Sequence, residues 1–195
     1  MKKTKKNFTL VELLCAVALI VILAGIGFSA YSYASHRGKE TATKSLITQF
    51  GAGLETLKTK HGFYPASSNY SDISITVNAD TGVITKINFG TTEIDTEDAD
   101  PNKQKRYQAQ MKDFLAVVDG ELLKKYVANG KLCDAWGSSI KYCYPGKINK
   151  IKFDIIAPGA DEGFGKDATA APGTSSADYR DTNDEWACDD IANFQ

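Results

Sequence analysis

One uninterrupted apolar stretch, over residues 8–34, constrains this chain more than any other feature. Lysine occupies four of the six positions at the start of the sequence, and Glu12 is the one charged residue within the stretch. About 20 apolar residues in a helix are enough to cross a hydrocarbon core of about 30 Å. The stretch therefore predicts a membrane-spanning helix. Glu12 in turn predicts a charge partner, because a carboxylate in hydrocarbon costs about 3 kcal/mol.

The residues around Glu12 read FTLVELL and follow the lysine-rich segment directly. This pattern resembles the processing site of type IV pilins and of the pseudopilins of type II secretion. The resemblance implies a leader over residues 1–7, cleavage by a prepilin peptidase between Asn7 and Phe8, and N-methylation of Phe8. It also implies that Glu12 pairs with the amino terminus of a neighbouring subunit. The family usually has glycine where this chain has Asn7, and we expect cleavage to survive because asparagine is small and polar.

Two other interpretations of the apolar stretch stay open. A cleaved secretory signal would end at a small-x-small site, which residues 32–34 (SYA) match, but Glu12 has no use at the front of a signal's apolar core. A plain membrane anchor is the second alternative. The lysines before the stretch favour a single-pass protein with a cytoplasmic amino terminus and the globular part on the other side of the membrane. The resemblance implies that this membrane is the inner membrane, that the head is periplasmic, and that the assembled filament is periplasmic or extracellular.

Helical patterning continues after the apolar stretch, over residues 35–65. Its apolar residues recur three or four positions apart, which predicts one buried helix face: Ala42, Leu46, Phe50, Leu54 and Leu57. Gly62 and Pro65 then signal a helix end near Lys60. The string GFYP at 62–65 also resembles a family element. We expect an α+β, pilin-like lollipop, in which a long amino-terminal helix packs its second half on a small antiparallel β-sheet head.

The middle of the chain, residues 66–128, looks like a variable insertion of hairpin and helix. Residues 73–77 and 83–89 alternate apolar and polar side chains around a turn and predict a β-hairpin. The acidic run 93–100 predicts a solvated loop. Residues 102–128 have helical spacing, and the dipeptide Asn-Gly that follows is expected to end that helix.

The last part of the chain, residues 129–195, predicts two strands at 139–144 and 151–156. Six short elements here resemble, in order and approximate spacing, the major pseudopilin of type II secretion. They are DAWG at 134–137, IKY at 140–142, PG at 145–146, FDI at 153–155, PGAD at 158–161 and DDIANF at 189–194. The family has tryptophan where this chain has Phe194.

In that pseudopilin family, the loop between the fifth and sixth elements holds a structural calcium ion. By position, the resemblance implies side-chain ligands from Asp161, Asp189 and Asp190, and a backbone carbonyl from Pro158. Calcium takes six to eight hard oxygen ligands, which an acidic, glycine-rich loop can supply. Rival carboxylates in the same loop are Asp178, Asp181 and Asp184. A solvated acidic tail without metal is the alternative interpretation.

Four cysteines are compatible with an exported head, where oxidation is permitted. Cys15 lies in the apolar stretch and acts there as a small hydrophobic residue. Cys133 and Cys143 are ten positions apart around the start of a predicted hairpin, so we expect a disulfide between them. Pairing of Cys188 with either one is the alternative.

No catalytic constellation is apparent, so we expect a structural protein and not an enzyme. His36 and His61 have no nucleophile near them in sequence. The resemblance implies a homo-oligomeric filament and four further partners: minor pseudopilins or pilins, the prepilin peptidase, an inner-membrane assembly platform and the membrane itself. The formal net charge of −1 and the lack of a basic stripe argue against nucleic acid. We expect a type II secretion pseudopilus subunit; the alternatives are a type IV pilin for adhesion, motility or DNA uptake, and a membrane-anchored calcium-binding module that does not polymerise.

Overall fold

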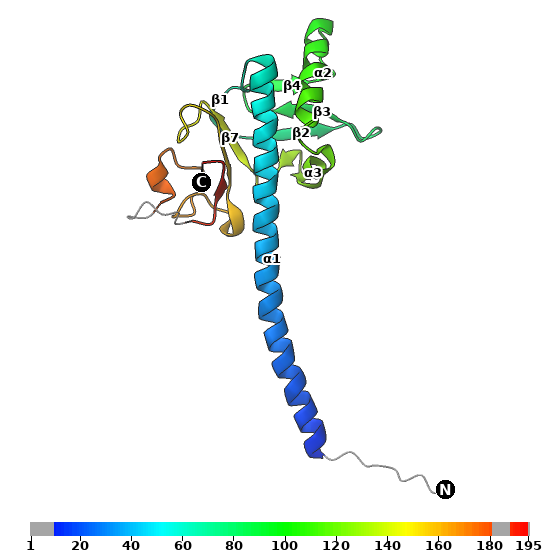
Figure 1. Ribbon diagram of the computed structural model, residues 1–195, viewed down its shortest axis with the longest axis vertical. Helices are drawn as coiled ribbons and strands as arrows, with labels where there is room; N and C mark the ends of the chain where they lie inside the picture. The colour runs from blue at the N-terminus through cyan, green and yellow to red at the C-terminus, as the bar shows by residue number, and fades with distance from the viewer. Residues whose placement is uncertain (1–9, 181–187, 195) are drawn as a thin grey trace, which may run out of the picture. The chain divides into compact units, whose positions relative to one another are not determined.

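The structure is a computed structural model that describes residues 10–180 and 188–194. Its contacts divide the chain into two compact units, Met1–Gly38 and Lys39–Gln195. Helix α1 (Leu10–His61) contributes residues to both units (Figure 1). The fold is α+β and pilin-like, because this long helix is followed by antiparallel sheets.

Helix α1 ends where the sequence predicts. Gly62 has a φ of +81°, and its N–H donates to the carbonyl of Lys58 at 3.0 Å. A left-handed residue after the last turn is a common helix end, and glycine adopts it without strain. The predicted stop at residues 61–62 is therefore confirmed.

The part of α1 within the second unit buries four of the five residues of the predicted stripe, and Ala42 is half-buried. Leu46, Leu54 and Leu57 are fully buried, and Phe50 is 1% exposed. Thr43 is also fully buried and lies outside the apolar pattern; its Oγ1 accepts a hydrogen bond from the N–H of Ala135 at 3.1 Å. The stripe thus combines apolar packing with one polar contact that ties the helix to the carboxyl-terminal half of the chain.

Two antiparallel sheets make up the rest of the second unit. The four-stranded sheet has the order β1 (Ser67–Asp72), β7 (Lys141–Tyr144), β8 (Asp154–Ala157) and β9 (Ile191–Ala192). The five-stranded sheet has the order β4 (Glu93–Asp95), β3 (Ile84–Asn88), β2 (Ser74–Val77), β6 (Lys131–Leu132) and β5 (Val127–Ala128). The remaining elements are helices α2 (Pro101–Leu115) and α3 (Gly120–Lys125) and the 3-10 turns η1 (Gly159–Asp161) and η2 (Ser176–Asp178). In Figure 1 the two sheets lie on either side of α1.

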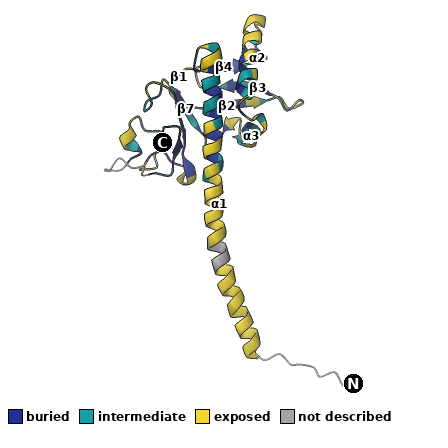
Figure 2. Ribbon diagram, viewed as in Figure 1, coloured by how far each residue is buried: buried dark blue, intermediate teal, exposed yellow. Residues whose placement is uncertain are grey.

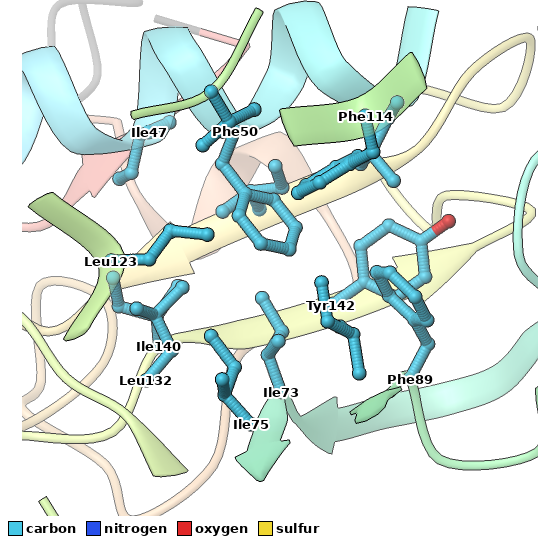
Figure 3. Close-up of a cluster of buried hydrophobic side chains, with 14 of the residues drawn as sticks. Ile47, Phe50, Ile73, Ile75, Phe89, Phe114, Leu123, Leu132, Ile140 and Tyr142 are labelled. Atoms are coloured by element: carbon cyan, nitrogen blue, oxygen red, sulfur yellow. The ribbon is translucent and has the colours of Figure 1, made fainter. Parts of the chain in front are cut away.

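The larger of two hydrophobic cores among the described residues joins α1 to both sheets and to α2. Phe50 of α1 lies at its centre, with its ring centroid 5.2 Å from that of Phe114 and 6.0 Å from that of Phe89 (Figure 3). Phe89 in turn contacts Tyr142 of the other sheet, with ring centroids 5.3 Å apart. These aromatic contacts connect elements that lie far apart in the sequence.

Gly53 of α1 allows α2 to approach the helix closely. A Cβ atom at this position would lie 2.5 Å from Cε2 of Phe114 and 2.5 Å from Cγ2 of Val118. Carbon atoms normally pack at about 3.5–4.0 Å, so only glycine fits between these side chains. Gly51, two residues earlier, has no such close neighbour. A Cβ atom at Gly51 would lie 3.7 Å from the ring of Phe153, which is an ordinary contact distance.

Two expectations for the middle of the chain are wrong. The single helix expected over 102–128 is two helices, α2 and α3, and Asn129-Gly130 is not its end. Asn129 and Gly130 have φ values of 52° and 73° and join the paired residues Ala128 and Lys131. Two consecutive positive φ values in a two-residue connection define a type I′ hairpin turn, for which Asn-Gly is the preferred sequence.

The acidic run 93–100 also differs from the expected solvated loop. Its first three residues form strand β4, because Ile94 is fully buried and pairs with Ile87 of β3. The hairpin expected at 73–77 and 83–89 is confirmed by β2 and β3, which pair antiparallel. The strands expected at 139–144 and 151–156 are confirmed as β7 and β8 with shifted boundaries.

Candidate functional site

The first unit presents an apolar helical surface. Its large apolar side chains on α1, from Leu10 to Leu23, are 53–77% exposed within the chain (Figure 2). Among the described residues, α1 is the one helix long and apolar enough to cross a membrane. Contiguous apolar surface of this extent marks contact with a membrane or with other proteins.

Glu12 lies in the first turn of α1, between Val11 and Leu13, and is exposed like its neighbours. A carboxylate near the amino-terminal end of a helix is favoured by the helix dipole. Asn7 and Phe8, the expected cleavage and methylation positions, lie outside the described residues. The structure therefore places Glu12 on the exposed apolar surface.

The carboxyl-terminal elements that the sequence singled out form one connected hydrogen-bond network. Asp134 of DAWG accepts, at Oδ1, the backbone N–H groups of residues 136, 137 and 138, each at 2.9 Å. Its Oδ2 accepts the N–H of Gly159 in PGAD at 3.2 Å. Burial raises the pKa of Asp134, although these backbone donors lower it. Asp134 thus holds two distant loops together.

Asp154 has the same role between other elements. It is fully buried, and its carboxylate accepts hydrogen bonds from the N–H groups of Ile148 and Asn149 at 2.8 and 2.9 Å and from the hydroxyl of Tyr70 at 2.9 Å. Asn193 joins the element DDIANF to the element FDI. Its side chain accepts a hydrogen bond from the N–H of Ile155 and donates one to the carbonyl of Phe153. The sequence elements therefore act as a structural frame.

Asp189 and Asp161, two of the expected calcium ligands, lie side by side. Oδ2 of Asp189 accepts the N–H of Ala160 at 2.6 Å and the N–H of Asp161 at 3.0 Å. Oδ1 of Asp161 accepts the N–H of Gly163 at 2.9 Å. The PGAD turn and the DDIANF strand are thus joined at the predicted loop.

Asp190, the third expected ligand, is 1% exposed, and its Oδ2 accepts the N–H of Gly165 at 2.6 Å. Burial raises the pKa of Asp190 to about 6; the charges of Asp189 and Asp161 act in the same direction, while hydrogen bonds from Cys188 and Gly165 act against it. The carboxylates of Asp189 and Asp161 thus act on the buried carboxyl group of Asp190.

The residues of this loop match calcium in donor type. Carboxylates and backbone carbonyls are the ligands that Ca²⁺ prefers. Within residues 10–180 and 188–194, however, no three His, Cys, Asp or Glu side chains converge on one point. Asp181 and Asp184 lie outside the described residues. Asp178 is engaged elsewhere, in a capping box with Ser175.

The disulfide expected between Cys133 and Cys143 is absent, and all four cysteines are free thiols. The strand register gives the reason. Cys133 forms a β-bridge with Ser139, and Cys143 lies four residues further along β7. Four residues of strand span about 13 Å, whereas the Cα atoms of a disulfide lie within about 7 Å. Cys143 instead approaches the carbonyls of Ser67 and Pro145.

Comparison with known proteins gives one finding. The family model described as the prokaryotic N-terminal methylation motif matches residues 5–28. This motif belongs to structural proteins of the pilin type, and nothing in the comparisons shows catalytic activity. No curated protein and no solved structure matches the chain. The match covers the segment that contains Glu12 and the first turns of α1.

Proposed function

We propose that this chain is a structural subunit of a type II secretion pseudopilus, a periplasmic filament that drives protein export. The observation that carries the proposal is the N-terminal methylation motif placed on a helix whose large apolar side chains, from Leu10 to Leu23, are exposed. A helix of this kind needs a partner surface along its whole length, which a membrane supplies before assembly and neighbouring helices supply in a filament.

Glu12 supports the proposal through electrostatics. Its carboxylate lies among exposed apolar residues of α1. If these residues pack against other helices in a filament core, the carboxylate is surrounded by a medium of low polarity. A positively charged amino terminus on a neighbouring copy would offset the cost of burying it. Processing before Phe8 by a prepilin peptidase would place such an amino group four residues from Glu12 along the chain. Each subunit would then carry both members of the ion pair.

The first test measures the amino-terminal residue and the intact mass of the native protein purified from membranes. A chain that begins with N-methylated Phe8 supports the proposal. A chain that still begins with Met1 contradicts it and favours an anchored module that does not polymerise.

The second test compares Glu12→Ala with Glu40→Ala, which removes the same side chain elsewhere on α1. We expect Glu12→Ala to insert into the membrane but to lose filament assembly, while Glu40→Ala assembles. Equal assembly of both variants would refute the role of Glu12.

A type IV pilin is the second candidate. The five-stranded sheet and α2, built by residues 74–132, add surface to the head, and such surface suits adhesion. Deletion of the gene separates the two candidates. Loss of protein export supports the pseudopilus, whereas loss of surface adhesion, motility or DNA uptake with normal export supports the pilin.

We also propose that the loop of Asp161, Asp189 and Asp190 binds a structural calcium ion, with the carbonyl of Pro158 as a further ligand. The supporting observations are the adjacency of Asp161 and Asp189 and the concentration of negative charge around Asp190. A bound dication would offset this repulsion and stabilise the folded head by linkage.

A further inference from the structure

A basic loop borders a groove of the second unit. Residues 147–152 read KINKIK, with three lysines and no acidic residue. Ile151, between two of the lysines, is 88% exposed. Lys152 pairs with Glu55 at 2.8 Å, and among the described residues Lys147 and Lys150 form no ion pair. The loop thus presents two lysines without an acidic partner and one exposed apolar side chain, a surface that an acidic partner would complement in charge.

The groove beside this loop has a volume of about 790 Å³ and runs between α1 and the loop. Its lining is mixed, with apolar groups from Ile47, Ile151 and Phe153 and amides from Asn149 and Asn193. Lys44, Lys152 and Glu55 also line it; Lys152 pairs with Glu55 and Lys44 with Glu40, each at 2.8 Å. The groove thus offers apolar contact and hydrogen-bonding groups, and it lies beside the loop that carries Lys147 and Lys150.

Hydrogen bonds to its backbone groups hold the basic loop in place. Asp154 accepts two of its N–H groups, from Ile148 and Asn149, and the N–H of Gly146 donates to the carbonyl of Lys152 at 2.9 Å. Because these bonds fix the loop before any partner arrives, little conformational entropy is lost on docking. The lysines are therefore presented on a rigid base.

A surface of opposite charge occurs elsewhere on the same unit. The turn between β4 and α2 carries Glu97, Asp98 and Asp100 without a basic residue among them. It is also rigid, because the N–H of Glu97 donates to Asp95 at 2.9 Å and the N–H of Asp100 donates to Asp98 at 2.8 Å. Glu97 and Asp100 are exposed. Figure 1 shows this turn and the loop after β7 on opposite sides of α1.

We propose that the basic loop 147–152 and its groove bind the acidic turn 97–100 of a second copy of this chain. The two surfaces are complementary in charge, and both are preorganised. Because they lie on different sides of one unit, the contact is head-to-tail and leaves each copy with one free surface of each kind. Repetition of such a contact extends an assembly. The inference rests on the proposed filament function and adds to it a contact between heads.

The test uses a zero-length carbodiimide cross-linker on the full-length protein in native membranes. Copies labelled with ¹⁵N are mixed with unlabelled copies, so that a link between two chains is recognised by mass spectrometry. We expect mixed-isotope links that join Lys147 or Lys150 to Glu97 or Asp98. Links from these lysines to acidic residues of other proteins, without mixed-isotope links to the turn, would overturn the proposal.

A charge exchange supplies the second arm. Lys150→Glu and Glu97→Lys, each alone, are expected to lower the mixed-isotope links and the yield of assemblies by about three-fold or more, since each puts like charges in contact. The double variant should restore both. Lys166→Glu, on a different exposed loop, is the matched control and should change neither.

The outcomes separate this inference from the proposed function. Normal assembly of the wild-type chain that is insensitive to both charge reversals refutes the head contact alone. Absence of assemblies from the wild-type chain refutes the filament function, and the head contact with it. Failure of the double variant to recover, with both single variants impaired, also counts against the pairing.

Discussion

Substituting Gly53 by alanine tests how tightly α1 and α2 are packed. Alanine is the better helix former by about 1 kcal/mol, so propensity alone predicts a more stable protein. The added Cβ would, however, lie 2.5 Å from atoms of both Phe114 and Val118, about 1 Å inside normal contact. Overpacking of a buried site costs about 1–3 kcal/mol, and here two side chains from the α2 region must move together. We expect a net loss of about 1–2 kcal/mol.

The assay is thermal unfolding of the full-length protein in detergent, followed by near-ultraviolet circular dichroism of the buried aromatic residues. The expected loss corresponds to a fall in melting temperature of about 3–6 °C for a head of this size. Gly51→Ala is the matched control on the same helix, because its Cβ would meet Phe153 at an ordinary 3.7 Å. It should raise the melting temperature by up to about 3 °C. Equal effects of the two substitutions would refute the reasoning.

Two further predictions concern charge. Asp72 forms ion pairs with Lys141 of one sheet at 2.6 Å and with Lys131 of the other sheet at 2.7 Å. Burial raises the pKa of Asp72, but hydrogen bonds from Lys131, Lys141 and Ser139 outweigh burial and lower the pKa to about 2. Because the folded pKa lies below the unfolded value, the stabilisation is present above about pH 4 and is lost as the pH falls toward 2. Asp72→Asn should therefore cost about 1–2 kcal/mol in denaturant unfolding at pH 7 and much less near pH 2, whereas Asp80→Asn, at an exposed position, is the control and should change the stability little at pH 7. Saturating calcium should raise the melting temperature by about 5 °C or more relative to chelator, and Asp189→Ala should abolish that difference; an equal melting temperature with and without calcium would exclude the ion.

The long helix could be predicted from sequence because its signals are local. Four buried positions of its stripe follow the helical period, and Gly62 with Pro65 gives an unambiguous stop. Thr43 could not be predicted, because its burial depends on the N–H of Ala135, which lies 92 residues away. Periodicity identifies which face of a helix is buried but not which polar side chain finds a partner there.

The end of the helical pattern at Asn129-Gly130 shows a different limit. Both a helix end and a hairpin turn favour this dipeptide, so local sequence leaves the choice open. Pairing with β2 favours the hairpin turn, because the N–H of Ile75 donates to the carbonyl of Gly130 at 2.8 Å. The disulfide prediction failed for a related reason, since ten positions of separation say nothing of strand register.

The carboxyl-terminal elements could be recognised from the sequence, but their joint role could not. Asp134, Asp154 and Asp189 all use their carboxylates to accept backbone N–H groups from other elements. A carboxylate that caps a turn and one that binds a metal look alike in a sequence. Only the positions of the facing groups separate the two.

The segment 74–131, which forms most of the five-stranded sheet, begins and ends on neighbouring strands. Ser74 pairs with Lys131, and the N–H of Leu132 donates to the carbonyl of Ile73. The two ends of the 74–131 segment are therefore about one strand spacing, roughly 5 Å, apart. A segment whose two ends lie this close together can be replaced by another without moving the flanking chain. A replacement segment would keep the path of the remaining chain if it supplied the apolar side chains that this segment adds to the core, among them Ile75, Phe89 and Phe114.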